Sequence, residues 1–470
     1  MHMFLNGEWV DRPEKIEVCN PQDGRVIDKV PQARAEDMSL AISSAVMGFE
    51  AMGALPTHLR ISVLQKAADT VASRCEQFAR TIALEGIKTI REARKEALRC
   101  AETLRLSAEE ARRISGQTIP FDQRVGSEHR LGYYFREPVG VIGAITPFND
   151  PLNLVAHKVG PALAAGNAII VKPHSATPLS ALMLAQTIQD AGLPRGFLQV
   201  ITGRGAFIGD VLVTDPRVRM ISFTGGRATG ESILKKSGLK KVAMELGSNS
   251  PVIVMPDADL DLALSANVSG AFWAAGQNCL HVQRLLLHEE IYSEFSARFI
   301  AAAAGYRVGD KLDEATDMGP LISEAAAIRV ESLVNEALAA GGTLLTGGKR
   351  AGTFYAPTVL ENLPPNCTLS SQEVYGPVTV LCRFNTLEEA IRLANSTDYG
   401  LQAGIFTRDI QTAFRAIAGL RCGGVMVNDS TDYRIDSMPF GGVKGSGLGR
   451  EGVQFAVQEM TEPKVVCINM

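Results

Sequence analysis

The segment GQNC (276–279) places Cys279 among small and amide residues, directly after the helix-like run SANVSGAFWAAG. A cysteine in such a polar setting can act as a thiolate nucleophile, because a helix end or a nearby charge lowers the pKa of its thiol. Attack on a carbonyl also needs donors for the developing oxyanion, and hydrolytic release needs a base. The sequence offers one candidate for each, Asn149 in the segment TPFNDP and Glu245 at the end of KKVAMEL.

Each of these residues also has a purely structural explanation. Free cysteines are commonly buried as small apolar side chains. Asn149 lies beside prolines, where asparagine is typical of turns. A single glutamate such as Glu245 at the end of a strand or helix is commonly solvated. Taken singly, the three residues leave both explanations open.

Two glycine-containing loops follow short apolar runs. Gly-Arg-Gly at 203–205 follows FLQVIT, and Gly225 with Gly226 follows ISFT. Glycines allow backbone N–H groups to approach a phosphate closely. Neither loop matches the G-x-G-x-x-G fingerprint, and such glycines also form tight turns. Lys172, which ends the run NAIIVK, can pair with ribose or phosphate or be solvated.

The elements that position these residues alternate between short apolar runs and helical segments. Residues 33–115 show apolar residues at three- and four-residue spacing, which predicts a helical layer. From residue 136 onward, β-branched runs alternate with helices, which is typical of buried parallel sheets. The expected strands of the first group are 139–146, 167–172, 197–202 and 218–224, and those of the second are SPVIVM, QRLLLH, PVTVLC, AGIFT and GGVMVN.

Length and charge limit the class of protein. The 470 residues predict two or three domains, and 47 Lys and Arg against 51 Asp and Glu give a net charge of -4. This balance argues against nucleic acid and anionic membranes as partners. The start MHMFLNGEWVDRP lacks the pattern of a signal peptide, and no later run is apolar enough to span a bilayer.

The metal-binding residue types show no ligand spacing. The eight cysteines are scattered without a CxxC pair. This pattern predicts reduced thiols in the cytoplasm and argues against structural zinc. The histidines likewise form no metal-ligand pattern, so we expect no metal.

In order and spacing, the motifs closely resemble those of the NAD(P)-dependent aldehyde dehydrogenase superfamily. The resemblance runs from LNGEWV (5–10) to EMTEPKVV (459–466). It rests on TPFNDP, GPALAAGNAIIVKP, FTGG, MELGSNSPVIV, GQNC, EVYGPV, NSTDYGLQAGIFT and MPFGGVKGSGLGREG. Among subgroups, the chain looks most like the branch of lactaldehyde and phosphonoacetaldehyde or phosphonoformaldehyde dehydrogenases.

The resemblance implies an α/β fold with three parts. A Rossmann-like cofactor domain would comprise 1–117 and 137–246, and an α/β catalytic domain 247–450. A small β oligomerisation element would comprise 118–136 and 451–470. Members of the family pair strands between subunits, which implies a homodimer or homotetramer.

The resemblance also assigns roles to residues. Cys279 matches the nucleophile that forms a thiohemiacetal and then a thioester, Asn149 with the Cys279 N–H matches the oxyanion hole, and Glu245 matches the base for thioester hydrolysis. The residues expected to bind the cofactor are Thr146, Pro147, Lys172, Ser175, Gly205, Gly225, Gly226, Gly247 and Glu373.

Two departures from the family pattern concern the cofactor. Many NAD-preferring members have a glutamate three residues after the lysine, where this chain has Ser175. Gly226 stands where a serine is common. The missing carboxylate would neither grip a ribose 2′-hydroxyl nor repel a 2′-phosphate, so NAD and NADP both remain admissible.

The substrate pocket is expected to contain cations and hydrogen-bond donors. The family positions indicate Arg105, His157, Asn278, His281 and Arg434. Because arginine and histidine can hold an anionic group, we expect a short polar aldehyde, anionic or hydroxylated. If Arg105 and Arg434 instead form salt bridges, a lactaldehyde or general small-aldehyde dehydrogenase remains, and two further alternatives are cofactor-free hydrolysis by Cys279 and a binding protein that has lost catalysis.

Overall fold

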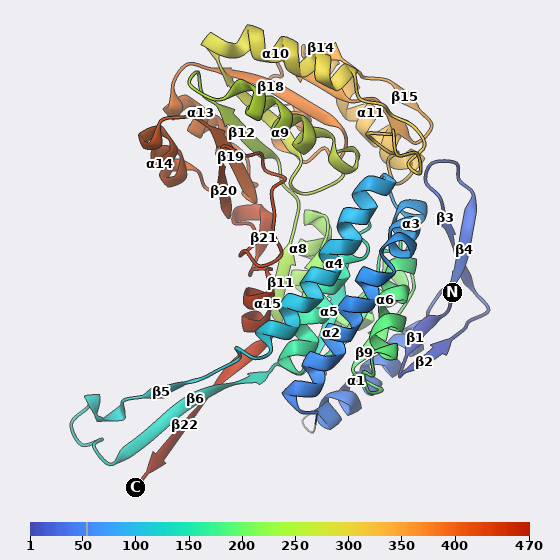
Figure 1. The fold of residues 1–470 in the computed structure, drawn as a ribbon, viewed down its shortest axis with the longest axis vertical. Coiled ribbons are helices and arrows are strands. Elements are labelled where there is room, and N and C mark those ends of the chain that lie inside the picture. The colour runs from blue at the N-terminus through green and yellow to red at the C-terminus, as the bar shows by residue number, and fades with distance from the viewer. Residues whose placement is uncertain (53–54, 366) are drawn as a thin grey trace.

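A twisted, mainly parallel sheet forms the core of the first half of the chain (Figure 1). The computed structural model describes residues 1–52, 55–365 and 367–470. The strand order is β2-β1-β9-β8-β7-β10-β11-β21, and the strands from β9 to β11 run parallel. Their bounds are β1 (Met3–Leu5), β2 (Glu8–Val10), β7 (Val141–Ile145), β8 (Ala168–Lys172), β9 (Leu198–Val200), β10 (Val218–Thr224), β11 (Lys241–Glu245) and β21 (Gly447–Leu448).

Helices cover both faces of this sheet because its strands are apolar on both sides. Alternate residues such as Ile169 and Ile170 enter different apolar clusters, as the two-residue period of a strand requires. One face packs against α1 (Ala35–Met52), α7 (Gly205–Thr214) and α8 (Arg227–Ser237). The other packs against α2 (Thr57–Ser73), α3 (Cys75–Glu85), α4 (Ile90–Glu110), α5 (Asn153–Ala165), α6 (Leu179–Asp190) and α15 (Val453–Glu459).

A second sheet forms the other lobe, with the order β14-β17-β18-β13-β12-β19-β20. Its strands are β12 (Ser250–Val254), β13 (Val282–His288), β14 (Thr343–Thr346), β17 (Thr358–Glu361), β18 (Val378–Phe384), β19 (Gln402–Phe406) and β20 (Gly424–Val427). Helices α9 (Leu260–Phe272) and α10 (Glu289–Ala304) pack on one face, and α13 (Leu387–Ala394) and α14 (Ile410–Gly419) on the other. The helices α11 (Glu324–Ala339) and α12 (Thr368–Ser371) join a further cluster.

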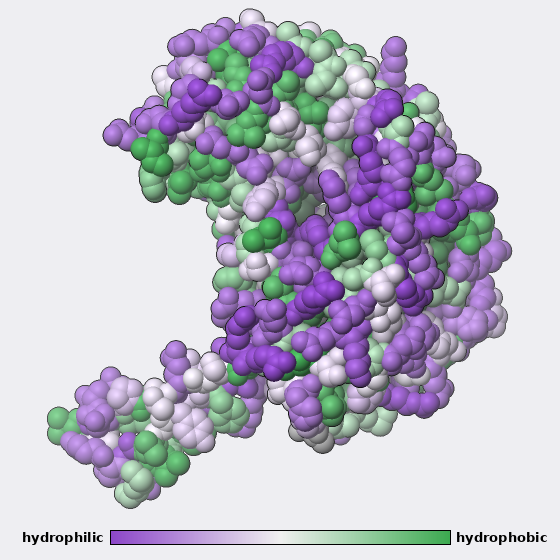
Figure 2. Space-filling model, in the orientation of Figure 1, coloured by the Kyte–Doolittle hydropathy of each residue, from purple (hydrophilic) through white to green (hydrophobic). Residues whose placement is uncertain are grey.

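A β arm projects from the first lobe (Figure 1). It consists of β5 (Gln117–Ile119), β6 (Arg130–Pro138) and the C-terminal β22 (Thr461–Asn469), with β6 in the middle. Apolar side chains gather on the arm (Figure 2), among them the exposed Tyr133, Phe135 and Val465. Two hairpins, β3 (Lys15–Cys19) with β4 (Val26–Pro31) and β15 (Arg350–Ala351) with β16 (Phe354–Tyr355), complete the sheets.

The α/β class and the expected strands are confirmed, whereas two expected domain edges differ from the sheets. The strand β21, expected in the catalytic domain, pairs with β11 of the first sheet. The helix α15, expected in the oligomerisation element, packs into the core beside α5, since Val457 and Met460 are buried there. In the described residues no helix is long and apolar enough to cross a membrane.

Candidate active site

A cavity of about 1000 Å³ lies where the carboxyl ends of the first sheet face segments of the second half. Thr146, Lys172, Thr224 and Glu245 follow or end the strands β7, β8, β10 and β11, and all line this cavity. Cys279 lines it from the opposite side. Ligands of open α/β sheets bind outside the carboxyl ends of the strands, which makes this cavity the candidate active site.

Asn149 and Glu245 present unpaired polar atoms there. Asn149 lies in the loop between β7 and α5, and its side-chain oxygen has no hydrogen-bond partner among the described residues. Neither carboxylate oxygen of Glu245, which is 4% exposed, has one either. Burial, and then the charge of Glu451, raises the pKa of Glu245 well above its ordinary value. The Glu245 carboxylate is therefore free to bond a reactant, and no described residue engages the amide oxygen of Asn149.

Cys279 lies between the 3₁₀ segment η2 (Trp273–Gly276) and β13, and its half-buried side chain packs against an apolar cluster that contains Phe440. Burial, and then the nearby charge of Glu245, raises the pKa of the thiol. Ala274 and Gly276 in the turn before it have left-handed φ angles of 50° and 65°. A Cβ at position 276 would lie 2.2 Å from the carbonyl oxygen of Gly376, so only glycine fits.

The opposite end of the cavity suits a dinucleotide. The helices α7 and α8 begin at Gly205 and directly after Gly226, so two N-termini with free N–H groups meet it. A Cβ on Gly226 would meet nothing within 4 Å, which leaves space above that backbone. Lys172 is buried at the same end, where desolvation lowers its pKa to about 8.

The predicted cofactor residues all line this one cavity. Near its middle the Ser248 N–H donates to Glu373 Oε1 at 2.9 Å, and burial raises the pKa of Glu373 to about 7. A Cβ on Gly247 would lie 2.3 Å from Glu373 Oε2. A glycine is therefore required where this carboxyl group lies against the backbone, and the set of donors fits a nicotinamide dinucleotide.

Two of the predicted substrate residues, Asn278 and Arg434, line the cavity. The Asn278 side chain donates to the carbonyl of Trp273 at 3.2 Å. The Arg434 guanidinium donates to Glu451 at 3.0 Å and lies 3.7 Å from the centroid of the Phe440 ring. Arg434 is therefore already paired with a carboxylate.

The other three, His157, His281 and Arg105, do not line the cavity. His157 is buried 2.8 Å from Asp436, and His281 is buried outside the cavity lining. Arg105 is 42% exposed and pairs with Asp69 of α2 at 3.2 Å. Each residue turns an α-helix by roughly 100°, so Arg105, six residues after Arg99, lies about 120° away from it around the helix. Arg105 therefore points out of the site.

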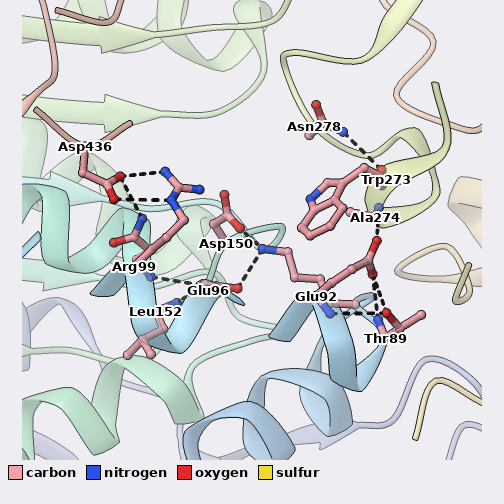
Figure 3. A network of polar contacts seen from close by, with 12 residues as sticks. Thr89, Glu92, Glu96, Arg99, Asp150, Leu152, Trp273, Ala274, Asn278 and Asp436 are labelled. Atoms are coloured by element: carbon pink, nitrogen blue, oxygen red, sulfur yellow. Dashed lines mark hydrogen bonds and ion pairs between the residues drawn. The ribbon is translucent and has the colours of Figure 1, made fainter. Parts of the chain in front are cut away.

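Sequence reasoning missed two cations on α4. Lys95 and Arg99 are one helix turn apart and both line the cavity. The Lys95 ammonium lies 4.9 Å from the centroid of the Trp273 ring and has no carboxylate partner among the described residues. Arg99 donates to Asp436 at 2.6 Å (Figure 3). Their i, i+4 spacing was the signal that could have found them.

No group of three or more histidine, cysteine or acidic side chains in the described part of the chain is arranged to hold a metal ion.

Comparison with known proteins places the chain in one family. The aldehyde dehydrogenase family model matches residues 9–466. Aspartate-semialdehyde dehydrogenase 1 of Pseudomonas canavaninivorans is 52% identical and covers 97% of this chain and 97% of its own. The 3-sulfolactaldehyde dehydrogenase of Priestia aryabhattai is 45% identical, and the match covers 100% of this chain and 98% of that protein. The lactaldehyde dehydrogenase of Methanocaldococcus jannaschii is 43% identical, and the match covers 99% of this chain and 100% of that protein.

Solved structures agree with this placement. Glyceraldehyde-3-phosphate dehydrogenase GapN from Methanocaldococcus jannaschii, complexed with NADP, superposes with a TM-score of 0.94 at 42% identity, covering 98% of this chain and 100% of its own. Family members use NAD or NADP as the oxidant of an aldehyde. The chain therefore belongs to the aldehyde dehydrogenase family and is an NAD(P)-dependent oxidoreductase that acts on an aldehyde.

Proposed function

We propose that the protein oxidises a short aldehyde that carries an anionic group to its carboxylic acid. Cys279 adds to the carbonyl carbon, and the Asn149 amide and the Cys279 N–H hold the oxyanion of the thiohemiacetal. The thiohemiacetal carbon then gives up its hydride, for which bound NAD or NADP would supply the acceptor, and a thioester of Cys279 remains. Glu245 then takes a proton from water, which attacks the thioester, releases the acid and regenerates the thiol.

The positions of the three residues support these roles. Asn149 follows β7, Glu245 ends β11 of the same sheet with β10 between the two strands, and Cys279 comes from the second half; all three border the same cavity. The buried Glu245 has no structural hydrogen bond to lose when it exchanges a proton. A buried carboxyl group with a raised pKa is suited to take up a proton.

Lys95 carries the case for an anionic substrate. It lines the cavity without an acidic partner among the described residues, next to Arg99, which has donors beyond those used by Asp436. Three of the relatives bear names of aldehydes with acidic groups: aspartate semialdehyde, 3-sulfolactaldehyde and glyceraldehyde 3-phosphate. A carboxylate, sulfonate or phosphate would complete the pairing of Lys95.

The test compares kcat/KM for a short anionic aldehyde and for lactaldehyde in Lys95→Ala, Lys95→Arg and Arg105→Ala. Loss of a hydrogen bond between charged groups is worth about 1.5–3 kcal/mol, so Lys95→Ala should lower kcat/KM for the anionic aldehyde roughly tenfold to a hundredfold. Lactaldehyde should be unaffected, Lys95→Arg should restore activity, and the exposed Arg105→Ala should change neither substrate. Equal effects on both aldehydes would mean a small hydroxyaldehyde dehydrogenase without an anion requirement.

We also propose that the arm joins subunits into a dimer or a dimer of dimers. The outer edge of β22 has no partner strand within the described chain, and such edges in stable proteins are covered. Exposed apolar side chains on the arm, Tyr133, Phe135 and Val465 among them, add a surface that another copy can cover.

A further inference from the structure

Two buried carboxylates on α4 bind backbone groups of other segments (Figure 3). Glu92 and Glu96 are 4% and 2% exposed and lie one helix turn apart. Burying an ionisable group is costly unless it is fully hydrogen-bonded. Their hydrogen bonds therefore show what they hold in place.

Glu96 holds the loop that carries Asn149. Its Oε1 accepts the N–H groups of Leu152 at 2.8 Å and Asn153 at 3.0 Å, where α5 begins. Its Oε2 accepts a hydrogen bond from Lys88 at 2.8 Å. The same buried Lys88 ammonium pairs with Asp150, the residue after Asn149. The loop is thus tied to α4 at the residues that directly follow Asn149 in the chain.

Glu92 holds the turn that leads to Cys279. Its Oε1 accepts the Ala274 N–H at 2.8 Å, and its Oε2 accepts the Thr89 N–H at 2.8 Å. Ala274 and Ala275 both have positive φ angles, 50° and 53°. A left-handed alanine costs about 1–2 kcal/mol, so this turn needs such an anchor to persist.

We propose that Glu92 and Glu96 are positioning residues that fix the Asn149 amide relative to the Cys279 N–H. This inference rests on the proposed roles of Asn149 and Cys279 in holding the oxyanion. The two donors come from different halves of the chain, so neither sheet alone sets their separation. The two residues are separated by about 6 Å of rise along one helix, and each holds backbone near one donor.

The first test is Glu96→Gln, which keeps the shape but turns an amide NH₂ toward Lys88 and breaks that pair. Misplacing a reacting group by about 1 Å can cost a hundredfold, so kcat should fall roughly tenfold to a hundredfold. The aldehyde KM and the dinucleotide Kd should stay within about twofold, because no binding group is removed. Glu92→Gln places an NH₂ group against the Thr89 N–H. It should likewise lower kcat and leave the aldehyde KM and the dinucleotide Kd nearly unchanged.

The second test is a double-mutant cycle with Asn149→Ala. If Glu96 acts through the Asn149 amide, Glu96→Gln should lower kcat by less than about twofold once that amide is gone. The matched control is Glu85→Gln. Glu85 is equally buried and accepts the N–H groups of Leu179 and Ser180 at the start of α6, but it does not line the cavity.

The outcomes separate the two proposals. If Asn149→Ala lowers kcat but Glu96→Gln multiplies that loss in full, the proposed function stands and the positioning role is overturned. The same holds if Glu85→Gln lowers kcat as strongly, because the effect would then be general destabilisation. If Asn149→Ala leaves kcat unchanged, the oxyanion role of Asn149 fails and this inference fails with it.

Discussion

Replacing Glu245 by glutamine should make the protein more stable and stop turnover. The Glu245 carboxyl group is buried, its two oxygens have no hydrogen-bond partner among the described residues, and Glu451 adds a second negative charge nearby. Glutamine has nearly the same shape and no charge to desolvate. Without the base, the thioester should persist, so the variant should reduce about one dinucleotide per active site and then stall.

The gain in stability should depend on pH in a defined direction. The ordinary pKa of a glutamate is 4.5, and the folded value of Glu245 is well above it. Between these values the folded protein holds a proton that the unfolded chain has released, so the free energy of unfolding falls as pH rises. One proton corresponds to about 1.4 kcal/mol per pH unit, so within that range the advantage of Glu245→Gln should grow by up to about 1.4 kcal/mol for each unit that the pH rises.

Urea unfolding of both proteins at pH 5, 6 and 7, at equal subunit concentration, measures this difference. The two curves of unfolding free energy against pH should diverge as pH rises. Parallel curves would mean that Glu245 is already ionised in the folded protein, and the assignment of a proton-exchanging base with a raised pKa would be refuted.

Two further predictions concern the cofactor and the assembly. Ser175→Glu places a carboxylate at the Lys172 end of the cavity, so kcat/KM for NADP should fall about tenfold or more through repulsion of the 2′-phosphate, while that for NAD falls less; equal losses would place the phosphate elsewhere. Deleting residues 461–470 removes β22 from the arm, and sedimentation should then show a smaller assembly than the full-length protein; an unchanged mass would show that subunits associate through another surface.

The strands could be predicted, and the three proposed reacting residues could be selected, because each leaves a local signal. The apolar run at 167–172 predicts a buried strand, and it forms β8, which ends at Lys172. Cys279 and Glu245 lie in motifs that can be recognised in the sequence, and the fold brings both residues to the same cavity. The sequence carries no local signal for which face of a helix or strand is turned toward the site, because tertiary packing decides this orientation. His157 and Arg105 were therefore assigned to a cavity that neither lines.

The charged residues of α4 show that the helical spacing of charged side chains, as well as that of apolar ones, can indicate how a helix is placed. Glu92, Lys95, Glu96 and Arg99 follow the i, i+3, i+4, i+7 spacing that in a helix normally marks an apolar face turned to the core. Here this stripe is charged: Glu92 and Glu96 are buried, and Lys95 and Arg99 line the cavity. Burying charge is tolerated only where other groups pair with it. A charged stripe at core spacing therefore indicates a helix that borders a polar site. In this protein the helix adds Lys95 and Arg99 to the cavity lining, and its Glu92 and Glu96 bind the backbone near both proposed oxyanion donors.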